Sequence, residues 1–176
     1  KFNNRLTWAS QAHISTYDLI QRQPVSGAIA MNASEKAVSI GFVSKIATIV
    51  NLFQSKFTNA TVDLTPWLDD PMTRATIDPD SIDICFHFPR RDRTHSDYTL
   101  LLQIRLQPER DKHDRVVGVE ISSHSLCGCL WEFSTVADWQ FSGTTGLSPE
   151  YQAQIKSFCQ DVLGVFQNNR YSHQDK

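Results

Sequence analysis

The stretch IDICFHF, residues 82–88, alternates apolar and polar side chains, and this alternation decides the fold class. Its isoleucines and phenylalanines share one parity, whereas Asp83, Cys85 and His87 take the other. Successive side chains of a strand point to opposite faces of a sheet, so the pattern predicts a strand with one buried face. The stretch YTLLLQIRL, residues 98–106, repeats the alternation after a polar connection. Together the two segments predict an antiparallel hairpin.

Two further segments extend this hairpin. A third strand is expected over residues 115–122, after the polar run QPERDKHD, and a fourth begins near Leu130. In LWEFSTVADWQF, residues 130–141, the aromatic residues share one parity. This part is therefore predicted to be one long strand or a bent pair of strands that buries aromatic rings on one face. The result is a meander of four or five strands.

Two helices are predicted on either side of the strands. Ser148 is a favourable N-cap and Pro149 suits a first helical position, and apolar residues then recur at helical spacing through residue 166. The helix is predicted over residues 149–167. Within residues 32–57 the second half also has helical spacing, from Ile46 to Phe57. Residues 37–43 fit a strand or a helix equally well, and the sequence leaves that choice open.

The predicted fold is an α+β domain, an antiparallel sheet of four to five strands with both main helices packed on its aromatic face. The domain is expected to occupy residues 32–167. Residues 1–31 are expected to form an irregular or helical N-terminal segment, and residues 168–176 a mobile tail, because the tail has no apolar stripe.

Composition excludes several classes of partner. The 176 residues carry a formal charge of −2, and the basic residues do not gather on one periodic face, so we expect no nucleic-acid partner. No apolar run reaches the ~20 residues that span a bilayer, so we expect no membrane contact. Four cysteines are too few for a disulfide scaffold and favour a cytoplasmic protein.

The polar parity of the sheet offers one candidate site. Five charged or ionisable side chains should share the face that points away from the aromatic core: Asp83, His87, Arg105, Glu120 and Glu132. Such a set could hold a metal or perform acid–base chemistry, as in a metal-dependent hydrolase or phosphodiesterase. The alternative is an exposed face with cross-strand ion pairs, such as Asp83 with Arg105.

The turn SHSLCGCL, residues 123–130, offers a second candidate site. His124, Cys127 and Cys129 are soft metal ligands, but structural zinc sites present two separated pairs of ligands. The simpler interpretation is a tight turn with small apolar cysteines. The loop SGTTGLSPEY does not predict a phosphate site, because Pro149 removes an N–H from the helix start and Glu150 adds a negative charge there. No cofactor is expected.

These observations favour a non-catalytic binding or accessory module that acts through contact with another protein. Trp8, Tyr17 and Trp67 lie outside the regular elements and are expected to be exposed contact residues. The enzyme reading remains as the alternative, with the five side chains of the polar face as its catalytic residues.

Overall fold

The computed structural model describes residues 32–68, 70, 78, 80–89, 98–109, 112–125 and 128–167. The expected N-terminal segment and tail lie outside these residues. In chain order, the elements are α2 (Ala33–Lys36), α3 (Ile40–Lys56), β1 (Thr61–Asp63), β2 (Ser81–Phe88), β3 (Tyr98–Glu109), β4 (Lys112–Ser125), β5 (Gly128–Ser134), β6 (Gln140–Gly143) and α5 (Pro149–Gln167).

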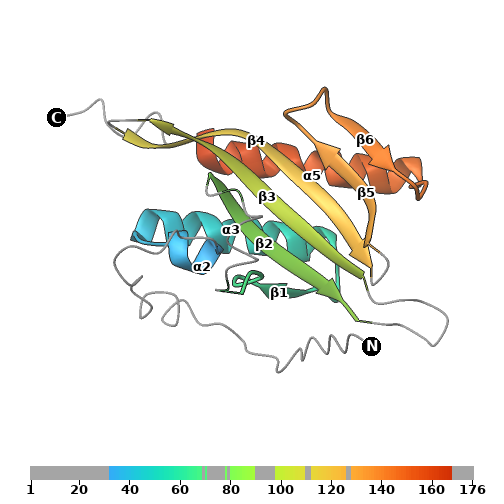
Figure 1. The fold of residues 1–176 in the computed structure, drawn as a ribbon, viewed down its shortest axis with the longest axis horizontal. Helices are drawn as coiled ribbons and strands as arrows, with labels where there is room; N and C mark the ends of the chain where they lie inside the picture. Colours follow the sequence, from blue (N-terminus) through green and yellow to red (C-terminus); the bar gives the residue numbers. More distant parts are fainter. Residues whose placement is uncertain are drawn as a thin grey trace.

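The strands form one six-stranded sheet in the order β1-β2-β3-β4-β5-β6, and each neighbouring pair is antiparallel. Figure 1 shows this meander with α3 and α5 on the same side of the sheet. The predicted α+β class is confirmed. The sheet has more strands than the four or five predicted, because the three residues of β1 are too few to show alternation. In addition, the aromatic stretch 130–141 is a bent pair, β5 and β6, with Asp138 and Trp139 in left-handed conformations at the bend.

Both main helices begin where a serine can cap them. The Ser148 hydroxyl accepts a hydrogen bond from the Tyr151 amide at 3.3 Å, and α5 runs over the predicted residues 149–167. Ser39 accepts from the Phe42 amide at 3.3 Å, so α3 begins at Ile40. In the ambiguous stretch 37–43, residues 40–43 are therefore helical and none is in a strand. Within the described residues, no helix is long and apolar enough to cross a membrane.

The core lies between the sheet and the two helices, and Phe53 of α3 is at its centre. The Phe53 ring stacks on Phe86 of β2, with centroids 3.6 Å apart, and meets the edge of Phe158 of α5 at 5.2 Å. All three side chains are fully buried. One ring thus joins the sheet to both helices. At the end of α3, the side chain of Gln154 donates a hydrogen bond to the Lys56 carbonyl and fixes α5 beside α3.

We predict that Phe53→Ala lowers the free energy of unfolding by about 3–5 kcal/mol, because it removes a buried aromatic ring and leaves a cavity among its partners. Urea unfolding followed by circular dichroism measures the loss. Gln54→Ala is the control, since the neighbouring Gln54 is exposed and should change stability by less than about 0.5 kcal/mol. Equal losses in the two variants would contradict the placement of Phe53 in the core.

Candidate functional site

The sheet face opposite α3 and α5, called the open face below, carries the polar side chains predicted from the alternation. Strand register places Asp83, Gln103, Glu120 and Ser134 side by side across β2, β3, β4 and β5. Asp83 and Glu120 are thus two strands apart, or roughly 9.6 Å at the usual strand spacing. The two carboxylates do not meet at one point.

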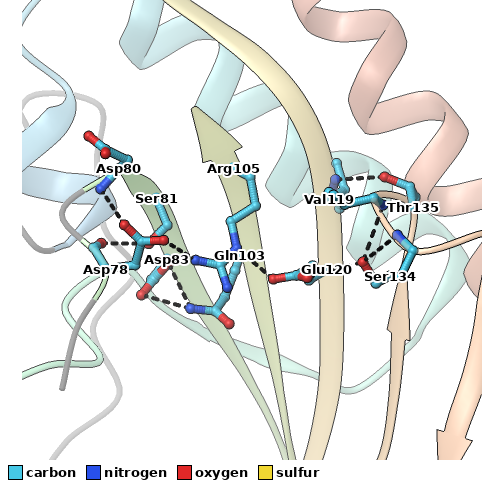
Figure 2. A network of polar contacts seen from close by, with 12 residues as sticks. Asp78, Asp80, Ser81, Asp83, Gln103, Arg105, Val119, Glu120, Ser134 and Thr135 are labelled. Carbon is cyan, nitrogen blue, oxygen red and sulfur yellow. Dashed lines mark hydrogen bonds and ion pairs between the residues drawn. The ribbon is translucent and has the colours of Figure 1, made fainter. Parts of the chain in front are cut away.

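Arg105 of β3 lies at the centre of a charged network on the open face (Figure 2). Its Nε donates to Glu120 Oε2 at 2.5 Å, and its Nη1 donates to Asp78, which precedes β2. Ser134 of β5 donates to the other oxygen of Glu120 at 3.0 Å. The guanidinium is therefore held between two carboxylates, and its charge is neutralised within the chain.

Asp83 is the one fully buried charged residue among the described residues, with 0% of its surface exposed. Its Oδ2 accepts a hydrogen bond of 2.5 Å from the Trp67 indole N–H, and Gln103 donates to it from 3.4 Å. Burial raises the pKa of the Asp83 carboxyl above its ordinary value, although these hydrogen bonds and the charge of Arg105 oppose the shift. The expected pair of Asp83 with Arg105 is replaced by the pairs of Arg105 with Asp78 and Glu120.

Trp67 is half-buried rather than exposed. Asn32, just before α2, holds its backbone from both sides: the Asn32 side chain accepts from the Trp67 amide at 2.9 Å and donates to the Trp67 carbonyl at 3.2 Å. With its indole N–H directed at Asp83, Trp67 acts as a cover for the β2 end of the open face. Trp8 and Tyr17, the other two predicted contact residues, lie outside the described residues.

His87, near the end of β2, belongs to a second polar group. Its Nδ1 is 3.0 Å from the Thr99 hydroxyl of β3, and its Nε2 is 3.8 Å from Asp63 Oδ2 of β1. The nearby His87 lowers the pKa of the Asp63 carboxyl. Burial, together with the negative charges of Asp63 and Asp83, raises the pKa of the Cys85 thiol to about 12. A thiol so protonated at neutral pH is a poor nucleophile.

Glu132 lies apart from the other predicted site residues. It is exposed on β5, pairs in register with Ser122, and accepts a hydrogen bond from Ser142 of β6 at 2.9 Å. Of the five predicted side chains, Arg105 and Glu120 make a direct contact with each other. Within the part of the chain that the structure describes, no three acidic, histidine or cysteine side chains gather closely enough to hold a metal.

The alternative metal site is placed only in part. His124 and Cys129 are register partners on β4 and β5, whereas Cys127 lies outside the described residues. The His124 Nε2 is 2.8 Å from the Ser122 hydroxyl, and the Cys129 thiol contacts the Trp131 carbonyl at 3.5 Å. Burial lowers the pKa of His124 and raises that of Cys129.

Three partners in these contacts were not predicted from the sequence. Asp78 and Trp67 come from the connection before β2, where no periodicity indicates which side chains return to the sheet. Asp63 lies in β1, the short strand that alternation does not reveal. Asp78 stands three residues before β2, and nothing in its local sequence indicates that it reaches Arg105 of β3.

We predict that Asp83→Asn becomes more stable relative to the unaltered chain as the pH rises from about 4. Above that pH the unfolded chain ionises Asp83 while the folded chain still holds its proton, so the unaltered protein loses stability up to the raised pKa of the folded state. Asparagine still accepts from Trp67 and does not titrate. Urea unfolding between pH 4 and 8 measures the gap. Asp80→Asn, at an exposed aspartate, is the control. A gap that does not widen with pH would contradict the burial of Asp83.

Comparison with known proteins gives a family but no activity. No curated protein and no solved structure matches the chain. A family model described as a domain of unknown function matches residues 34–168, from α2 to the end of α5. The match covers most of the chain. It includes all nine described elements, except that α2 begins one residue before it. The chain therefore belongs to this family, a domain of unknown function.

Proposed function

We propose that the chain is a non-catalytic binding module that acts through contact with another protein. One observation carries the proposal: the charged side chains of the open face have partners within the chain and do not converge on a common point. Arg105 forms ion pairs with both Asp78 and Glu120, while Glu132 accepts a hydrogen bond from Ser142. Catalysis by acid and base groups requires such side chains to meet around a reacting atom.

The exposed half of the open face supports the same proposal. Over β2 this face is closed, since Ser81 and Asp83 are fully buried. Over β5 and β6 it is open: Glu132 and Ser142 are exposed, and Val136, in the turn between these strands, is 56% exposed. A surface with an exposed apolar residue among polar groups is suited to protein contact.

The free thiols of the chain support a location in the cytoplasm, where the environment is reducing. Cys85 and Cys159 are free thiols, and they lie on opposite faces of the sheet, in β2 and on α5. Burial raises the pKa of Cys159 to about 12, as it does for Cys85. Free, buried thiols of this kind are typical of proteins that fold without disulfides.

The proposal is tested by capture of a partner with the purified chain as bait. We expect a protein that is retained by the unaltered chain and lost with Val136→Asp, and that binds again when both proteins are purified. Val38→Asp is the matched control, because Val38 is 77% exposed and precedes α3 rather than lying beside β6. Equal retention by both variants, or no retained protein at all, would count against the proposal.

The enzyme alternative is separated by thermal unfolding with and without Mg²⁺, Mn²⁺ or Zn²⁺. We predict that Glu120→Gln lowers stability by about 1 kcal/mol, because it breaks the half-buried pair with Arg105, whereas Glu132→Gln changes it by less than about 0.5 kcal/mol. Neither the unaltered chain nor the variants should gain stability from the cations. A cation-dependent rise in melting temperature that vanishes in both variants would favour a metal-dependent hydrolase or phosphodiesterase instead.

A further inference from the structure

We infer that the outer edge of β6 accepts an extended segment of a partner protein as a seventh strand, and that an apolar side chain of this segment enters a cavity beside Trp131 and Phe141. The inference rests on the proposed function, because it names the surface and the chemistry of the protein contact.

The first observation is the position and composition of β6. It is the last strand in the sheet order, so its outer side faces no described strand. In an antiparallel pair, alternate residues direct both backbone groups toward the neighbour. Half of β6 therefore directs its N–H and C=O groups away from β5. Edge strands are usually protected by charges, proline or a bulge. The sequence of β6, QFSG, has neither charge nor proline, and its register with β5 is unbroken.

The opposite edge of the sheet is better protected. There, β1 is about as short as β6 but ends on the charged Asp63, whereas β6 carries no charge. The Asp63 carboxylate accepts a hydrogen bond from the Thr65 amide at 2.8 Å and turns the chain away directly after the strand. Of the two edges, β6 is therefore the one suited to strand addition.

The second observation is a cavity of about 230 Å³ that adjoins the same edge. The rings of Trp131 and Phe141, with centroids 5.8 Å apart, form its apolar part together with Leu147. The lining residues come from β5, β6, the connection after it and the first turns of α5: Trp131, Phe141, Ser142, Gly143, Thr145, Gly146, Leu147 and Gln152. Three of them belong to β6 itself, so a strand paired with β6 would run along the cavity.

Gly143 shapes the junction between the edge and the cavity. Its φ is +135°, and an added Cβ would lie 2.5 Å from the Leu130 carbonyl oxygen. The chain then turns inward, because the amides of Thr144 and Thr145 both donate to that same carbonyl, at 2.9 and 3.2 Å. The free edge thus ends at Gly143, and the cavity opens beside its last residues.

These two features together specify the occupant. Unpaired backbone groups are satisfied by another extended backbone, and the adjoining aromatic pocket is satisfied by an apolar side chain, which is the pattern of β-strand addition. The Lys156 ammonium lies 5.8 Å from the centroid of the Phe141 ring. An acidic residue next to the apolar one would therefore be favoured in the added segment.

The test begins with selection of peptides from a displayed library of random twelve-residue sequences, against the full chain. An enriched peptide is then synthesised, and its affinity is measured by fluorescence polarisation. The protein variant is Gly146→Leu, which places a side chain at the cavity. An added Cβ at Gly146 meets no atom within 4 Å, so the fold should be retained. Gly41→Leu is the matched control, since Gly41 in α3 has the same open surroundings.

We expect Gly146→Leu to weaken peptide binding at least about tenfold, and Gly41→Leu to change it less than about twofold. A peptide with N-methyl groups at alternate backbone positions should also lose at least about tenfold, because it cannot pair with a strand. This second measurement uses the unaltered chain, so it remains decisive if Gly146→Leu fails to fold.

The inference is overturned if no peptide is enriched, if the peptide binds Gly146→Leu and the unaltered chain equally, or if N-methylation has no effect. The partner protein captured in the test of the proposed function distinguishes failure of this inference from failure of the proposed function. A partner that binds the Gly146→Leu chain normally would leave the proposed function standing and remove β6 as its site.

Discussion

The register between β2, β3 and β4 is the constraint on which the rest of the structure depends. It aligns Ile82, Ile104 and Val119, all fully buried, beneath the helices. A slip of one residue in β3 would turn Ile104 to the open face and Arg105 toward the core beneath the helices. Burying the guanidinium away from its two carboxylates would cost far more free energy than the shifted strand pairing could contribute. Hydrophobic burial on one face therefore fixes the place of every charge on the other.

This division explains why the polar side chains predicted from the sequence share a face without converging on a common point. Alternation collects charged residues on the open face, but each strand holds them about 4.8 Å from its neighbours. The side chains then pair locally, as Arg105 does with Glu120, and Trp67 closes over Asp83. At the end of the sheet, the outward backbone groups of β6 face no described strand. An added strand at β6 would satisfy these groups with the same kind of backbone hydrogen bonds that join the other strands.

The sequence predicts what periodicity encodes and misses what tertiary contacts decide. Alternation in residues 82–88 and the stripe of α5 predict the sheet, the helix and the open face correctly. The polar parity also places Glu120 near Arg105. Contacts from aperiodic segments are different: nothing in residues 64–78 indicates that Trp67 lies on Asp83 or that Asp78 reaches Arg105. The edge cavity is equally hidden, because it depends on how the connection after Gly143 turns back to Leu130.

Amide hydrogen exchange, followed by NMR on the unbound chain, tests the central claim most directly. Exchange reports which backbone N–H groups are protected by stable hydrogen bonds. We expect slow exchange throughout residues 98–106 of β3, which has a strand on each side, and alternating slow and fast exchange along Gln140–Gly143 of β6. Uniform protection of β6 would show that the edge is already paired within the chain and would exclude strand addition there.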